Sequence, residues 1–345
     1  MKKITKNKYA NFYLNAAESL GLDYEIINEK VGLARIFNET VNLDVSSNVL
    51  GVNTQLSSSL SVNKVKTSTL LQEKNIPVPN FRTFKDRILA TKYASKQLLK
   101  KKYVVIKPIS GSLSIGITVK PSSVIQIKKA IIEAFEGNSC IMIESYVPGN
   151  HYRVTVLDNE IIAITRRIPA NILCDGKNTV KFLIAEKNVK RRKMKLPEIF
   201  LRDKDKDYIK KEKIELSKIY PDGTLIDLQL GCDLDIGGER VRIDRDSIPQ
   251  INLDLFIKAT QALTLRFAGI DYITPDIMIP HAQCVTAINE INSAPDSDVH
   301  YRDTYPHDNY AAERIVKKIF SQKISLTDES VALPFIQHVP VVIAD

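Results

Sequence analysis

A flexible turn between two strand-like runs, at residues 103–120, carries the residue types of a phosphate-binding loop. β-Branched residues at 104–106 indicate a buried strand, and a second short apolar run follows at 117–119. The turn between these runs contains Gly111, Ser112, Ser114 and Gly116. Glycines let backbone N–H groups approach an anion, serine hydroxyls add donors, and Lys107 places a positive charge beside the turn. The segment therefore predicts a hairpin that closes over a phosphate group.

Taken alone, the same segment also fits an ordinary Gly/Ser hairpin beside an exposed lysine. It matches neither of the helix-opening patterns GxGxxG and GxxxxGK[ST], which argues against Rossmann and P-loop sites. The phosphate interpretation therefore depends on other groups in the chain.

Two carboxylates and an amide late in the sequence form a candidate magnesium site. The runs at 273–279 and 285–292 are expected to pair as antiparallel strands, which would bring Asp276, Glu290 and Asn292 to one end of a sheet. Glu290 and Asn292 are two residues apart, so both point to the same face. Oxygen ligands of this kind suit Mg²⁺, which keeps waters and phosphate oxygens in its shell. The alternative is that the Asp and Glu are simply exposed to solvent. The predicted phosphate-binding loop elsewhere in the chain favours the metal site.

Composition indicates a globular protein with two or three lobes, because the chain has 345 residues of which 44% are hydrophobic and 26% charged. The net charge of +9 favours an anionic partner. Four widely separated cysteines show neither disulfide nor metal-ligand spacing, which favours a reducing cytoplasm. We expect neither a signal peptide nor a membrane span, since no apolar run is long enough.

Hydrophobic periodicity predicts the elements that would position these groups. Helices are expected at residues 9–20, 63–74, 86–102, 122–135, 179–186 and 253–267, and strands at 41–45, 49–52, 140–143, 153–157 and 161–167. Ser57, Ser58 and Ser59 suggest a joint between lobes, and residues 175–178 form a hairpin-type turn.

Residues 187–213 are expected to leave the sheet as a mobile excursion, because their charges are too dense to bury. Lys190, Arg191, Arg192 and Lys193 would attract an acidic substrate at the mouth of the site. Binding of nucleic acid is the alternative, but no aromatic stacking platform accompanies the run.

The motifs, in this order, resemble those of the ATP-grasp carboxylate–amine ligases, over roughly residues 50–320. The resemblance rests on Lys64 before a helix, Val105-Ile106-Lys107-Pro108, the loop at 111–116, Ile143-Glu144-Ser145-Tyr146-Val147-Pro148-Gly149, Asp276, and Glu290-Ile291-Asn292-Ser293-Ala294-Pro295. Residues 166–170, 175–180 and 234–238 are similar to the ATP-grasp module of cyanophycin synthetase and bifunctional glutathione synthetase. The 111–116 loop is similar, more distantly, to that of D-alanine–D-alanine ligase.

The resemblance implies an α+β protein with the ATP-grasp fold, in which two α+β subdomains clasp ATP. We expect a small N-terminal α/β lobe at 1–60 and a subdomain with the phosphate-covering hairpin at 61–147. A C-terminal subdomain with the metal site would occupy 148–325, followed by a tail at 326–345.

The resemblance also implies roles for individual residues. The residues expected to bind ATP are Lys64, Lys107, Gly111, Ser112, Ser114, Gly116, Glu144, Ser145, Val147 and His151, with the backbone at 145 and 147 meeting the adenine. Asp276, Glu290 and Asn292 would hold two Mg²⁺ ions, with Mn²⁺ as an alternative ion. Arg153 and Arg167, together with Lys107, would act on the transferred phosphate or the substrate carboxylate. Strand alternation sends Arg166 and Arg167 to opposite faces, and we favour Arg167.

The activity implied is ATP-dependent formation of an amide bond between a carboxylate and an amine through an acyl phosphate, with release of ADP and phosphate. Small-molecule or peptide substrates, acidic ones included, and a cytoplasmic homodimer are expected. Departures from the family pattern at His151 and Gln229-Leu230 keep a nucleotide-binding regulatory protein as the alternative. A third departure, at Asp296, affects the expected acceptor pocket. A basic nucleic-acid-binding protein is the third interpretation, and rests on charge alone.

Overall fold

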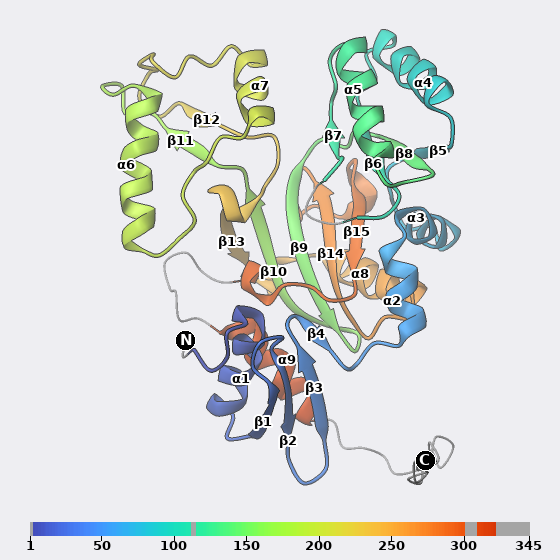
Figure 1. Ribbon diagram of the computed structural model, residues 1–345, viewed down its shortest axis with the longest axis vertical. Coiled ribbons are helices and arrows are strands. Elements are labelled where there is room, and N and C mark those ends of the chain that lie inside the picture. The colour runs from blue at the N-terminus through green and yellow to red at the C-terminus, as the bar shows by residue number, and fades with distance from the viewer. Residues whose placement is uncertain (1–2, 112–114, 301–308, 322–345) are drawn as a thin grey trace, which may run out of the picture.

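The computed structural model describes residues 3–111, 115–300 and 309–321, and in these ranges the strands form four antiparallel sheets (Figure 1). A five-stranded sheet lies in the middle of the molecule, and the other three sheets lie around it. The α+β class expected from the sequence is confirmed.

The N-terminal lobe is a four-stranded sheet covered by two helices. Its strands are β1 (Asp23–Asn28), β2 (Leu33–Phe37), β3 (Asn42–Ser46) and β4 (Val49–Leu50), paired in that order. Helix α1 (Lys8–Ser19) is capped by Asn7, whose side chain accepts hydrogen bonds from two N–H groups of the first turn. Helix α9 (Tyr310–Ser321) shares the apolar core of α1 and this sheet. A helix from the end of the described chain therefore completes the first lobe.

The central sheet has the strand order β13-β10-β9-β14-β15. Its strands are β9 (Asn150–Leu157), β10 (Glu160–Ile168), β13 (Glu239–Ile243), β14 (Phe267–Thr274) and β15 (Ala287–Asn292). Tyr152, Val154 and Val156 of β9 share a hydrophobic core with helix α8 (Gln250–Ala262). Because side chains alternate along a strand, His151, Arg153 and Thr155 point to the opposite face. That face carries the polar groups described below.

A second unit covers one side of this polar face. It contains β5 (Phe81–Phe84), β6 (Val104–Pro108), β7 (Thr118–Val119), β8 (Ile141–Ser145), α4 (Arg87–Leu99) and α5 (Val124–Phe135). Its sheet has the order β5-β8-β6-β7, and α5 buries Ile127, Ala130 and Ile131 against it. The predicted hairpin is therefore present as β6 and β7.

A third unit lies across from the second in Figure 1. It consists of β11 (Asn171–Leu173), α6 (Val180–Lys193), α7 (Asp203–Lys211) and β12 (Leu225–Asp227). The unit has an apolar core of its own, to which Leu183, Ile199 and Ile209 contribute.

The remaining elements connect these units. They are α2 (Gln55–Val62), α3 (Lys64–Glu73) and the short 3-10 helices η1 (Leu234–Ile236), η2 (Arg245–Ser247), η3 (His281–Gln283) and η4 (Ser297–His300). Asn63 ends α2 and caps α3, because its side chain accepts hydrogen bonds from the N–H groups of Val65 and Lys66. No helix in the described ranges combines the length and the apolar character that crossing a bilayer requires.

Several structural predictions are wrong. The helix expected at 253–267 is α8, which ends at Ala262, and Phe267 already begins β14. Ser57, expected in a joint between lobes, is buried inside α2, where Thr54 provides the N-cap. The helix expected to end at residue 186 continues to Lys193. Residues 187–213 leave the central sheet as predicted, but they do not lack apolar contacts, since Ile199 and Ile209 are buried in the core of the third unit.

Candidate active site

A cavity of about 1630 Å³ lies over the polar face of the central sheet. It is lined by residues of that sheet, of the second and third units and of the N-terminal lobe. Pockets for single small ligands are about 300–1,000 Å³. The cavity therefore has room for a nucleotide together with further substrates.

Two buried lysines bring positive charge to one end of the cavity. Lys107 Nζ lies 2.8 Å from Glu144 Oε1, and both side chains are 3% exposed. Lys64 Nζ lies 3.1 Å from Glu290 Oε1 and 3.2 Å from the carbonyl oxygen of Gly111, at the start of the hairpin turn. Burial raises the pKa of Glu144, and the Lys107 ammonium opposes that rise. The two ammonium groups are thus fixed between the hairpin and the central sheet.

A β-bulge in β15 determines which side chains this strand presents. Asp271 of β14 pairs with Glu290, whereas the next residue, Tyr272, pairs with Ile288, which leaves Asn289 as the extra residue. Both Asn289 and Glu290 therefore line the cavity. The Asn289 amide oxygen lies 3.5 Å from Lys107 Nζ.

Asp271 is the centre of the charged face of the central sheet. Its Oδ1 lies 2.7 Å from Arg153 Nε on β9 and 3.1 Å from Arg167 Nη2 on β10. Burial acts to raise the pKa of Asp271, but the two guanidinium groups outweigh it and hold the pKa below its usual range. A carboxylate, rather than a carboxylic acid, therefore faces the cavity at neutral pH.

Asp271, Glu290 and Asn292 provide the oxygen set expected of a hard cation site. Asp271 is the cross-strand partner of Glu290, and Asn292 lies on the same face two residues further along β15. Within the described residues, no group of three or more His, Cys, Asp and Glu is arranged for a metal ion. Two carboxylates with one amide oxygen nevertheless fit the ligand chemistry of Mg²⁺.

Asp276 does not join this set, contrary to the prediction. β14 ends at Thr274, earlier than expected, and Asp276 follows it in a turn where its Oδ1 accepts a hydrogen bond from the N–H of Met278. Strands rise about 3.3 Å per residue, so five residues carry Asp276 well beyond Glu290. Sequence reasoning missed Asp271, although its position between small and apolar strand residues was visible.

Most of the predicted binding residues lie together. Those that line the cavity are Lys64, Lys107, Gly111, Glu144, Ser145, Val147, His151, Arg153, Arg167, Glu290 and Asn292. Gly116 and Asp276 are not among the lining residues, and Ser112 and Ser114 lie outside the described residues. Arg166 points away, as alternation predicts, and donates a hydrogen bond to Asn150 Oδ1.

His151 contributes a neutral ring to the site. Burial, and then the neighbouring Arg167 guanidinium, lower its pKa to about 4. An imidazole that is uncharged at neutral pH can act as a hydrogen-bonding group without adding charge beside the arginines.

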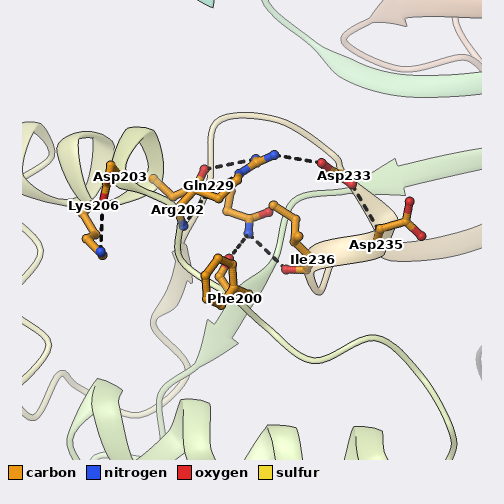
Figure 2. A network of polar contacts seen from close by, with 9 residues as sticks. Phe200, Arg202, Asp203, Lys206, Gln229, Asp233, Asp235 and Ile236 are labelled. Atoms are coloured by element: carbon orange, nitrogen blue, oxygen red, sulfur yellow. Dashed lines mark hydrogen bonds and ion pairs between the residues drawn. The ribbon is translucent and has the colours of Figure 1, made fainter. Parts of the chain in front are cut away.

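Gln229, at the position of one sequence departure, holds a loop rather than facing the cavity (Figure 2). Its Nε2 donates to the carbonyl oxygens of Phe200 at 3.2 Å and Ile236 at 3.1 Å. Arg202 spans the same region, since it pairs with Asp205 and with Asp233, each at 2.9 Å. The network ties the cavity-lining residues 230–235 to the connection between α6 and α7.

The basic run at the end of α6 does not line the cavity, contrary to the prediction. Lys190 and Arg192 pair with Glu186 and Glu198. The guanidinium of Arg191 is turned inward and donates to the carbonyl oxygens of Pro197 and Gly238. The cationic side chains of this unit that do line the cavity are Lys195, Arg202, Lys204 and Lys211.

The fold is that of the ATP-grasp proteins. The structure resembles the crystal structure of a bifunctional glutathione synthetase from Pasteurella multocida, with a TM-score of 0.63 and 23% identity over 90% of this chain and 44% of that chain. The resemblance to ATP-grasp ligases drawn from the motifs is confirmed at the level of the fold.

Comparison of sequences finds proteins that are similar to parts of this chain. Residues 70–200 match the family described as "D-ala D-ala ligase C-terminus". The chain is 29% identical over 269 residues to the glutathione biosynthesis bifunctional protein GshAB of Mannheimia succiniciproducens, which covers 75% of this chain and 35% of that protein. It is 27% identical over 264 residues to the GshAB protein of Streptococcus agalactiae serotype V, covering 74% and 35%. The chain thus spans about a third of the length of these curated relatives.

Proposed function

We propose that this protein is an ATP- and Mg²⁺-dependent ligase that joins a carboxylate to an amine and releases ADP and phosphate. The observation that carries the proposal is the convergence of Arg153 and Arg167 on Asp271, the strand partner of Glu290, within a cavity that has room for ATP and two further substrates.

The site residues suit the phosphates and the adenine of the nucleotide and its metal ions. Lys64 and Lys107 would neutralise the phosphates, and the backbone around Ser145 and Val147 would meet the adenine. Asp271, Glu290 and Asn292 would hold two Mg²⁺ ions. When bound, these ions neutralise charge on the phosphate oxygens.

The chemistry follows from the weakness of a carboxylate as an electrophile. A carboxylate oxygen attacks the γ-phosphorus, the bond to the ADP oxygen breaks, and an acyl phosphate forms. The amine then attacks the acyl carbon, the phosphate leaves with the former carboxylate oxygen, and the nitrogen loses a proton. Arg153 and Arg167 would stabilise the negative charge that develops on these oxygens.

A screen for ADP release tests the proposal. Pairs of amino acids and short peptides are incubated with ATP and Mg²⁺, and the products are identified by mass spectrometry. We expect at least one pair to give ADP and an amide in equal amounts. Nucleotide binding without ADP release for any pair would contradict the ligase assignment and favour a regulatory protein.

The four cysteines Cys140, Cys174, Cys232 and Cys284 are all free thiols in the structure. Free thiols support the proposal that the enzyme works in the reducing cytoplasm.

A further inference from the structure

Asp296 lines the end of the cavity that the N-terminal lobe closes. It lies between β15, which ends at Asn292, and η4, which begins at Ser297. Lys8, Tyr9 and Asn48 of the N-terminal lobe line the cavity at the same end. Asp296 is thus four residues beyond the proposed metal ligand Asn292.

Asp296 accepts a hydrogen bond from an amide but forms no ion pair among the described residues. The Asn48 Nδ2 group donates to Asp296 Oδ1 at 2.8 Å and to the carbonyl oxygen of Ala294 at 2.7 Å. No lysine, arginine or histidine of the described ranges forms an ion pair with Asp296. Its neighbour Asp298 differs in this respect, because Asp298 Oδ2 lies 3.2 Å from Lys8 Nζ. Among the described residues, one carboxylate at this end therefore has an ion-pair partner and the other has none.

Asp296 is close to the arginine of the reaction centre. A Cβ atom placed on Gly269 would lie 2.5 Å from Pro295 Cβ and 2.8 Å from Arg153 Nη1, so both residues converge on this glycine. Arg153 in turn pairs with Asp271. A substrate that reached the reaction centre from the N-terminal lobe would pass beside the Asp296 carboxylate.

The surroundings of Asp296 favour a cation. Burial and then the nearby Asp298 raise the pKa of Asp296, while Arg153 and Lys8 lower it less strongly. A cation bound beside the carboxylate would offset both the burial and the like charge.

We infer that Asp296 recognises a positively charged group on the amine substrate, and that this substrate belongs to the class of basic amino acids and diamines. The inference rests on the proposed ligase function and specifies its acceptor. It concerns the amine, whereas the acidic substrate expected from the basic run of α6 is a separate prediction.

The test compares L-lysine with L-norleucine, which has the same carbon chain but no second ammonium group. Binding of each amino acid is measured by titration calorimetry, and KM is measured with each as the amine. A charge-assisted contact predicts at least about tenfold tighter binding and lower KM for L-lysine. In Asp296→Asn, which keeps the acceptor for Asn48, this preference should disappear while KM for ATP stays unchanged.

Asp298→Asn is the matched control, because it removes one negative charge from the same end of the cavity. A direct contact with Asp296 predicts that Asp298→Asn keeps most of the preference for L-lysine. An equal loss of the preference for L-lysine in both variants would overturn the assignment. It would indicate that the total negative charge at this end of the cavity, and not a contact with Asp296, attracts the cation. A wild-type protein that turns over amines without preferring L-lysine would overturn the inference alone. A wild-type protein that forms no amide with any pair would instead overturn the ligase function.

Discussion

At the scale of single residues, the site is a set of charges that compensate one another on one face of a sheet. Asp271 accepts from two arginines, while Lys64 and Lys107 each pair with a glutamate. Removing one partner of a buried pair leaves the other charge exposed to a low dielectric, so each group depends on its neighbours.

Asp271→Asn should lower turnover by roughly 100-fold or more, since it removes a proposed metal ligand and the anchor of Arg153 and Arg167. ATP binding should change far less, because both buried lysines remain. Amide formation and calorimetric ATP binding measure the two effects. Asp276→Asn is the matched control and should leave turnover within about twofold. If Asp276→Asn were the damaging change, the assignment of Asp271 would be wrong.

Gly269→Ala should reduce turnover without removing any charged group. The added Cβ would meet Pro295 and Arg153 well inside normal contact distance, so Arg153 must move. Gly51→Ala is the control, since the nearest atom to its added Cβ is 3.5 Å away. Steady-state kinetics should show a loss of kcat for the first variant only. Thermal unfolding checks that both variants are folded. Equal kcat in both variants would mean that the position of Arg153 does not matter.

Residue types were easier to predict from the sequence than their positions. Lys64, Lys107, Glu290 and Asn292 were found from their motifs, and alternation separated Arg167 from Arg166. Asp271 was missed because the end of β14 was placed too late, and a shift along a strand changes which acidic residue faces its partner. The bulge at Asn289 left no signal in the sequence.

At the scale of elements, η4 anchors the end of the cavity that Asp296 lines to the central sheet. His300 Nε2 lies 2.7 Å from Thr155 Oγ1, and Nδ1 lies 2.8 Å from Thr165 Oγ1. Burial, and then the positive charges of the neighbouring arginines, lower the pKa of His300 to about 3. The facing charged groups are Arg153, Arg167, Arg240 and Arg242. The folded protein therefore requires a neutral imidazole.

The stabilisation from neutral His300 should be fully present above pH 6.5 and decline as the pH falls towards 3. In this range the unfolded chain binds the proton more readily than the folded one, so acid favours unfolding. Urea unfolding of the wild type and His300→Gln at pH 7.5 and 4.5 measures the effect. The wild-type advantage should narrow at pH 4.5. An advantage that is the same at both pH values would show that His300 does not titrate in this way.

Gln229→Met should destabilise the protein by about 1–3 kcal/mol, because the carbonyl oxygens of Phe200 and Ile236 would lose a buried donor. Gln250→Met is the control, since Gln250 bonds an exposed aspartate at a helix start. Urea unfolding measures both variants. A loss no larger than that of the control would mean that the network in Figure 2 does not hold the loop.

Helices with apolar periodicity were predictable, and elements with polar sequences were not. α5 was found because Ile127, Ala130 and Ile131 fall on one face. α2 was missed because three consecutive serines suggested a joint, although Ser57 and Ser61 are buried in the fold. The length of α6 was missed because its C-terminal turn is basic, and only tertiary contacts bury Arg191.

At the scale of the whole molecule, the cavity lies where the central sheet, the second unit, the third unit and the N-terminal lobe meet. This arrangement brings residues from distant parts of the chain, such as Lys64, Lys107 and Glu290, to one place. The net charge of +9 suggested an anionic partner, and its distribution is more specific. Lys64 and Lys107 lie at the proposed nucleotide end, whereas Asp296, which has no ion-pair partner among the described residues, lies at the end that the N-terminal lobe closes.

The most direct test of the proposed ligase follows an oxygen atom. The carboxylate substrate found in the ADP-release screen is labelled with ¹⁸O in both oxygens, and released phosphate is analysed by mass spectrometry. Transfer through an acyl phosphate predicts one ¹⁸O atom in each phosphate, because the amine breaks the bond between the acyl carbon and that oxygen. Unlabelled phosphate, with both labelled oxygens accounted for elsewhere, would contradict the mechanism.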